Sequence, residues 1–136
     1  MIGLGGKIER DGPDFEMGTI PLEVTPAASE DPIFEGVSNG FLAVSCHQEL
    51  ARQVPEGCTV LAKTERCLHA FRVNGKPFWA FQFHPELDRD CFVQRLGVFR
   101  DKYTDSDEAY EDVASQFMET PVSNDLLKRF LDVVSR

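Results

Sequence analysis

The sequence predicts an α/β fold with a mixed sheet, a β-hairpin and C-terminal helices. Residues 40–47 (GFLAVSCH) form an unbroken apolar run of strand length, which is typical of a strand covered on both faces. Two β-rich runs flank Asn74-Gly75, the strongest short-range signal for a hairpin. Apolar residues recur at helical spacing in residues 88–103 and 123–136. A chain of 136 residues is long enough for one core, and we expect a single domain.

The first element is expected to be the end of a helix. In residues 1–6 (MIGLGG), Gly5 and Gly6 supply a helix C-cap, and residues 7–10 (KIER) follow as a strand. Because a single helical turn is too short to be stable by itself, we expect the chain to begin inside a secondary-structure element.

An extended segment and a short helix are expected next. Residues 16–26 (EMGTIPLEVTP) are extended, and Pro21 suits an edge strand or a bulge, since proline has no N–H to donate in a central strand. Residues 29–37 (SEDPIFEGV) predict a short helix that Ser29 or Asp31 caps.

The second half of the chain is predicted to hold a strand, the hairpin and the helices. Residues 48–57 are expected to be a loop or short helix, and residues 58–65 (CTVLAKTE) a strand before the hairpin of residues 67–83. Residues 104–120 are acidic and predict a helix or helix-like loop with a solvated face. The apolar positions of the other two helices are Phe92, Leu96 and Phe99, and then Leu127, Phe130, Leu131 and Val134.

The composition argues against nucleic acid and membranes as partners. The formal net charge is -9, which repels phosphate backbones and anionic lipids. No apolar run reaches the roughly 18 residues of a membrane span. The N-terminus lacks the basic stretch and long apolar core of a secretory signal, so we expect a cytoplasmic protein.

The cysteines favour neither a disulfide framework nor a metal site. They lie apart in expected strands and a helix, without a C-x-x-C motif, and are expected to be reduced. A zinc site from Cys46-His47 and Cys67-Leu68-His69 is disfavoured, because neighbouring residues on a strand point to opposite faces. We therefore expect no metal and no cofactor.

The tip of the last β-rich run, His84-Pro85-Glu86, admits two interpretations. On a strand, His84 and Glu86 would share a face, and the carboxylate would fix the tautomer of the imidazole and support its protonated form. The pair would then be a general base for a nucleophile such as a cysteine thiol. In the alternative, His84 ends the strand and Glu86 caps a helix that begins near Asp88.

The residues around this tip resemble a known family. Residues 79–87 (WAFQFHPEL) are similar to the G-V-Q-F-H-P-E motif of class I glutamine amidotransferase domains. Residues 43–86 resemble the second half of that domain, as in the glutaminase part of GMP synthase, and residues 1–87 follow the family order. The resemblance implies an incomplete three-layer, flavodoxin-like domain, so residues 1–136 would be a single but partial domain.

The resemblance also implies roles for individual residues. His84 matches the catalytic base of the family, and Glu86 matches the acid that orients it. His47 matches a turn whose backbone helps to hold glutamine, which makes His47 and Gln48 candidates for substrate binding. Because Gln48-Glu49 stands where Gly-Asp or Ser-Leu is usual, His47 is equally well interpreted as a packed structural histidine.

The nucleophile of the family is absent from these residues. It is a cysteine in a G-x-C-x-G turn between a strand and a helix, and no such motif occurs here. Since removal of the nucleophile removes nearly all of the rate, we expect this polypeptide alone not to hydrolyse glutamine.

Three functions remain open at this point. The first is the C-terminal half of a glutamine-hydrolysing domain, with L-glutamine as substrate and a synthase domain or an N-terminal amidotransferase half as partner. The second is a non-catalytic interaction or regulatory module with the same fold. The third is the hydrolysis of γ-glutamyl or peptide bonds by a similar Cys-His arrangement, which the Q-F-H-P-E flank disfavours.

Overall fold

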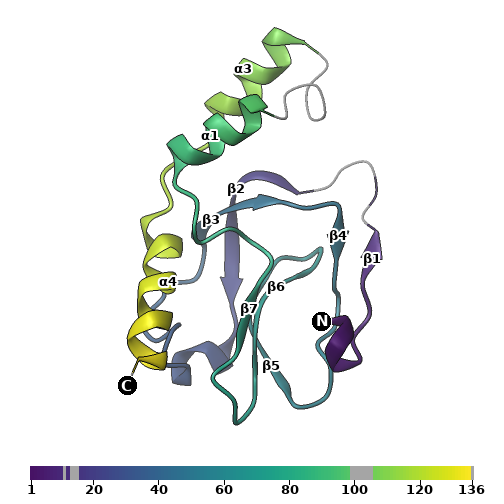
Figure 1. Ribbon diagram of the computed structural model, residues 1–136, viewed down its shortest axis with the longest axis vertical. Helices are drawn as coiled ribbons and strands as arrows, with labels where there is room; N and C mark the ends of the chain where they lie inside the picture. The colour runs from purple at the N-terminus through teal and green to yellow at the C-terminus, as the bar shows by residue number, and fades with distance from the viewer. Residues whose placement is uncertain (11, 13–15, 99–105, 136) are drawn as a thin grey trace.

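A five-stranded sheet forms the centre of the computed structural model, which describes residues 1–10, 12, 16–98 and 106–135. The strand order is β3-β2-β5-β6-β7, and every pairing among these strands is antiparallel (Figure 1). The strands are β2 (Met17–Val24), β3 (Phe41–Cys46), β5 (Cys58–Lys63), β6 (Leu68–Val73) and β7 (Trp79–Phe81). Two short strands, β1 (Glu9–Arg10) and β4 (Glu49–Leu50), pair separately.

The predicted hairpin is confirmed. β6 and β7 are joined by a turn at Asn74-Gly75, where Gly75 has a φ of 71°, a left-handed conformation that glycine adopts without steric cost. The apolar run of residues 40–47 is also a strand, β3, and it is largely buried. Both were predictable because their signals are local.

Pro21 lies inside β2, in a stretch where this strand pairs with a neighbour on one side. Along residues 17–22, β2 pairs with β3 alone, and it pairs with β5 only at Glu23 and Val24. The missing N–H of Pro21 therefore costs no pairing to β5, as expected for a proline at an edge.

The short helix predicted for residues 29–37 is displaced. A 3₁₀ helix covers Pro26–Glu30 instead, and turns follow it. Asp31 begins these turns, because its Oδ1 atom accepts hydrogen bonds from the backbone N–H groups of Ile33 and Phe34. The buried Asp31 carboxylate also accepts from the indole of Trp79 at 3.1 Å and the guanidinium of Arg72 at 3.2 Å. These long-range contacts fix the segment in a way that its local sequence does not encode.

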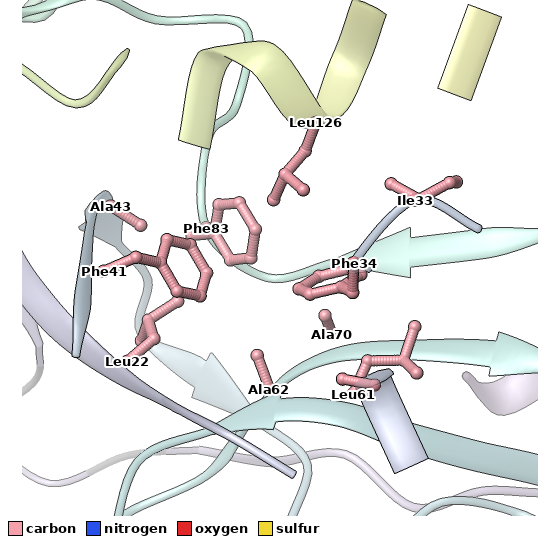
Figure 2. Close-up of a cluster of buried hydrophobic side chains, with 11 residues drawn as sticks. Leu22, Ile33, Phe34, Phe41, Ala43, Leu61, Ala62, Ala70, Phe83 and Leu126 are labelled. Atoms are coloured by element: carbon pink, nitrogen blue, oxygen red, sulfur yellow. The ribbon is translucent and has the colours of Figure 1, made fainter. Parts of the chain in front are cut away.

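The helix α4 (Pro121–Val134) covers one face of the sheet (Figure 1). Figure 2 shows Leu126 of this helix pointing into a cluster of aromatic and aliphatic side chains from the strands. The buried members of this core are Leu22, Ala28, Ile33, Phe34, Phe41, Ala43, Leu61, Ala62, Ala70, Phe83 and Leu126.

The predicted apolar face of α4 is only partly correct. Phe130 packs against the core, but so do Leu126 and Val133, whereas Leu127, Leu131 and Val134 are exposed. The helix carries apolar residues on more than one face, and only the sheet selects which face is buried.

The remaining helices form a second, smaller core. α1 (Arg89–Val98) packs on α3 (Asp107–Ser115) and the segment after it, with the rings of Phe92 and Phe117 stacked at 4.3 Å (Figure 1). The prediction that Phe99 extends the first helix falls outside the described residues. Among the described helices, none has the length and apolar composition that crossing a membrane requires.

Candidate functional site

The imidazole of His84 and the carboxylate of Glu86 are in contact. The Nδ1 atom of His84 lies 2.8 Å from Oε1 of Glu86, a hydrogen-bond distance. The expected proximity is therefore present, but its expected cause was wrong. β7 ends at Phe81, and the two residues meet across a turn in which the N–H of Leu87 donates to the carbonyl of His84 at 3.4 Å.

The pair is open to an incoming group. The side chains of His84 and Glu86 are 31% and 49% exposed, and within the described part of the chain no hydrogen bond engages Nε2 of His84. With Nδ1 held by the carboxylate, Nε2 is the nitrogen that can accept a proton. Chemically the pair can act as a general base toward a group that approaches from outside.

Two anchors hold the His-Pro-Glu turn in place. The backbone N–H of His84 donates to the carbonyl of Val44 in β3 at 2.8 Å. The Nδ2 atom of Asn124, in α4, donates to the carbonyls of Pro85 and Leu87, both at 2.9 Å. The turn is thus attached both to the sheet and to the helix that covers it.

A second group of polar side chains is buried near the same end of the sheet. Oε2 of Glu16, just before β2, lies 3.1 Å from Nε2 of His47 and 2.9 Å from Nε2 of His69. The thiol of Cys67 lies 3.4 Å from Nε2 of His69 and 3.5 Å from Oε2 of Glu16. We call Glu16, His47, Cys67 and His69 the buried cluster.

The carboxylate of the buried cluster is held in its ionised form. Burial by itself opposes ionisation of Glu16, but hydrogen bonds with His47, His69 and Thr64 and the electrostatic attraction of His69 outweigh it. Together they bring the pKa of Glu16 far below its ordinary value of 4.5. This end of the sheet therefore holds a partly buried anion between two imidazoles.

Comparison with known proteins assigns the chain to a family. The family model described as glutamine amidotransferase class-I matches residues 1–94, which is more than half of the chain and includes the His-Pro-Glu turn. The chain belongs to the class I glutamine amidotransferase family. Structural neighbours have the same fold as this amidotransferase chain.

The similar proteins are longer than this chain. The GMP synthase (glutamine-hydrolyzing) of Clostridium novyi is 30% identical over 95 residues, which are 68% of this chain and 18% of that protein. The same enzyme of Thermotoga maritima is 31% identical over 93 residues, which are 68% of this chain and 17% of that protein. The amidotransferase chain thus spans less than half of either relative, and it is related to the glutaminase domain of GMP synthase.

Solved structures agree on the fold. A glutamine amidotransferase from Thermotoga maritima superposes with a TM-score of 0.76 at 20% identity and covers 96% of this chain and 55% of its own. A glutamine amidotransferase from Methylobacillus flagellatus gives a TM-score of 0.68 at 16% identity, over 96% of this chain and 57% of its own. The predicted amidotransferase fold is therefore confirmed.

Asp88, and not Glu86, caps the helix after the turn of this amidotransferase chain. Oδ1 of Asp88 accepts a hydrogen bond from the backbone N–H of Cys91 at 2.7 Å, which lowers the pKa of the Asp88 carboxyl. The interpretation of Glu86 as the helix cap is therefore wrong, and its carboxylate is engaged by His84 instead.

The cysteines of the amidotransferase chain differ in exposure. Cys91 is exposed, but hydrogen bonding to Asp88 and the negative charge of that carboxylate raise the pKa of its thiol, which disfavours the nucleophilic thiolate. Cys67 is buried among its cluster partners, and Cys46 and Cys58 are half-buried. No disulfide joins the four.

His47 and Gln48 follow β3, at the position expected for the substrate-binding turn. Their side chains lie in different surroundings. The His47 imidazole is buried and bound to Glu16, in keeping with its interpretation as a packed histidine, whereas Gln48 is exposed. A contact between this turn and substrate stays a prediction.

A zinc site that included His47, Cys67 and His69 was disfavoured from the sequence, whereas Glu16 and Asn124 were not predicted at all. The pattern Cys67-Leu68-His69 places two donor side chains on the same face at the start of β6, which was an available signal. Adjacent residues of a strand point to opposite faces. Cys67 and His69 are two positions apart, so they share a face. Nothing local points to Glu16 or Asn124, because both act across long stretches of sequence.

Proposed function

We propose that residues 1–136 form a single, partial glutaminase domain that supplies the general-base half of a glutamine-hydrolysing site. The observation that carries this proposal is the 2.8 Å contact of His84 with Glu86, partly exposed and inside the family-matched segment. The nucleophilic cysteine comes from a segment outside these residues, since no G-x-C-x-G motif occurs within them. The domain acts in the cytoplasm, where its thiols stay reduced.

In the proposed mechanism His84 moves protons and Glu86 orients it. Nε2 of His84 takes the proton of the incoming thiol, whose sulfur attacks the side-chain carbonyl carbon of glutamine. The C–N bond then breaks, and His84 returns the proton to the departing ammonia. Water, activated by the same imidazole, hydrolyses the thioester to give glutamate. The backbone at His47 and Gln48 holds the main-chain groups of glutamine.

The partner of this domain is inferred from the relatives. The matched proteins are GMP synthases, so we infer that ammonia passes to a synthase domain of that kind. An N-terminal amidotransferase half that carries the nucleophile is the second partner.

The test joins residues 1–136 to an amidotransferase segment that carries the G-x-C-x-G turn. We expect the joined protein to release ammonia from glutamine, and His84→Ala to reduce that rate by at least about 10²-fold. Lys128→Ala, on the exposed side of α4, is the matched control and should keep the rate. A folded joined protein without activity, an active His84→Ala variant, or ammonia release by residues 1–136 alone would each contradict the proposal.

The second candidate function is a non-catalytic interaction module. It is favoured by one observation, the exposed apolar stripe of Leu127, Leu131 and Val134 on α4. The same experiment separates the two functions, because an interaction module would yield no glutaminase activity when the nucleophile is restored.

A further inference from the structure

The buried cluster brings four different donor atoms to one point. Nε2 of His47, Nε2 of His69, Sγ of Cys67 and a carboxylate oxygen of Glu16 all lie within 4.8 Å of one another. Five of their separations are 2.9, 3.1, 3.4, 3.5 and 3.8 Å. The donors come from three segments: the residue before β2, the turn after β3 and the start of β6. Such convergence from distant segments is a feature of a built site.

These separations are close to the edges of a tetrahedral zinc site. Zinc bonds of about 2.0–2.2 Å to nitrogen and oxygen and about 2.3 Å to sulfur place neighbouring donor atoms about 3.3–3.6 Å apart. We propose that Glu16, His47, Cys67 and His69 bind one Zn²⁺ ion. The observed donor-to-donor distances lie on both sides of the required ones. Shifts of the donor atoms by a few tenths of an ångström would bring all four to bonding distance of one ion.

The charges and the burial of the donors suit a divalent cation. A thiolate from Cys67 and the carboxylate of Glu16 neutralise the charge of Zn²⁺, and the two imidazoles bind it in their neutral form. The side chains of His69 and His47 are 0% and 5% exposed, whereas Glu16 is 12% exposed, so the ion would enter past the carboxylate. The mixture of one sulfur, two nitrogens and one oxygen favours zinc over magnesium and calcium, which prefer oxygen alone.

The outer shell of the site is incomplete. The Nδ1 atoms of His47 and His69 are buried and find no hydrogen-bond partner within the part of the chain that the structure describes. Partners at that position normally raise zinc affinity about 10–100-fold. We therefore infer an affinity below that of zinc sites in which each histidine has such a partner.

The site is separate from the His84–Glu86 pair, although His47 would bind the ion through its imidazole and glutamine through its backbone. His84 and Glu86 contact each other and contribute no atom to the buried cluster. A bound ion would instead join the segment before β2 to β3 and β6, and would stabilise the folded chain because the unfolded chain does not hold the four donors together. Its detection does not depend on enzymatic activity.

The experiment is a metal titration of residues 1–136 after treatment with a chelator. We expect one equivalent of Zn²⁺ to bind and to raise the melting temperature. Co²⁺ in its place should give the sulfur-to-metal charge-transfer band and the intense visible bands of a tetrahedral thiolate site. Cys67→Ser should abolish the charge-transfer band, and His69→Gln should weaken Zn²⁺ binding at least ~10-fold.

Matched variants keep the test decisive. Cys91→Ser removes the exposed thiol and should leave the titration and the Co²⁺ spectrum unchanged. If Cys67→Ser fails to fold, Glu16→Gln takes its place, because Glu16 is the most exposed donor and glutamine has nearly the same shape as glutamate. This variant should weaken Zn²⁺ binding at least ~10-fold. Absence of stoichiometric Zn²⁺ binding to the wild-type chain, or equal binding by the wild type and the folded ligand variants, would overturn the proposal.

Discussion

The side-chain amide of Asn124 donates a hydrogen bond to the backbone carbonyl of Pro85 at 2.9 Å. The same Nδ2 atom also donates to Leu87 at 2.9 Å, so one side chain of α4 spans the turn that carries His84 and Glu86. The turn contains a proline and only one weak internal backbone contact, from Leu87 to His84 at 3.4 Å. Its shape therefore depends on a residue from a helix much later in the chain.

Replacement of Asn124 by alanine should destabilise the protein. The change leaves two carbonyls without their donor, and we expect a loss of about 2 kcal/mol in the free energy of unfolding, measured by urea denaturation. Hydrogen exchange at residues 85–87 should become faster. Lys128→Ala, exposed on the same helix, is the control and should change the stability by less than about 0.5 kcal/mol. Equal stability of the two variants would show that Asn124 does not hold the turn.

Replacement of Glu86 by glutamine tests its orienting role. In the protein joined to a G-x-C-x-G segment, Glu86→Gln removes the negative charge that supports the protonated imidazole of His84, and we expect the rate of ammonia release to fall about 10²–10⁴-fold. The KM for glutamine should change little, because Glu86 is proposed to act on His84 and not on the substrate. Glu65→Gln, at an exposed position, should retain the full rate. A Glu86→Gln variant as fast as this control would refute the role.

Adjacent leucines of α4 test which face of the helix is buried. Leu126 is 0% exposed and Leu127 is 37% exposed. We expect Leu126→Ala to cost about 3 kcal/mol of unfolding free energy, because it opens a cavity in the core, and Leu127→Ala to cost less than about 1 kcal/mol. Both variants remove the same atoms, so each serves as the control for the other in a denaturant titration. A larger loss of stability for Leu127→Ala than for Leu126→Ala would show that α4 packs on the sheet through the face that carries Leu127.

The reactivity of Cys91 should depend on Asp88. Hydrogen bonding with Asp88 and the charge of that carboxylate raise the pKa of the Cys91 thiol above its ordinary value of 9.0. The thiolate, which is the reactive form, is therefore populated only at higher pH, and alkylation of Cys91 should have its pH midpoint above 9.0.

The Asp88→Asn variant supplies the control for this prediction. Removal of the negative charge should lower the pH midpoint of Cys91 alkylation, followed by mass spectrometry of the modified peptide. The exposure of Cys91 does not depend on this charge, so the direction of the change reports on the pKa of the thiol. An unchanged midpoint would contradict the assigned cause.

The sequence by itself determined the elements whose signals are local. Asn74-Gly75 predicted the hairpin because few residue pairs fit its backbone, and the apolar run at β3 predicted a buried strand. The proximity of His84 and Glu86 was also predicted from the sequence, although the two residues meet across a turn and not on the predicted strand. The family was evident from the same residues.

Only the tertiary structure decided the contacts between distant segments. It selected the face of α4 that is buried, placed Asn124 on the His-Pro-Glu turn, and gathered Glu16, His47, Cys67 and His69 at one end of the sheet. The physical reason is common to all three. A side chain's local sequence fixes its strand or helix, but its partners are fixed by packing between elements, and cluster members such as Glu16 and His69 are 53 positions apart.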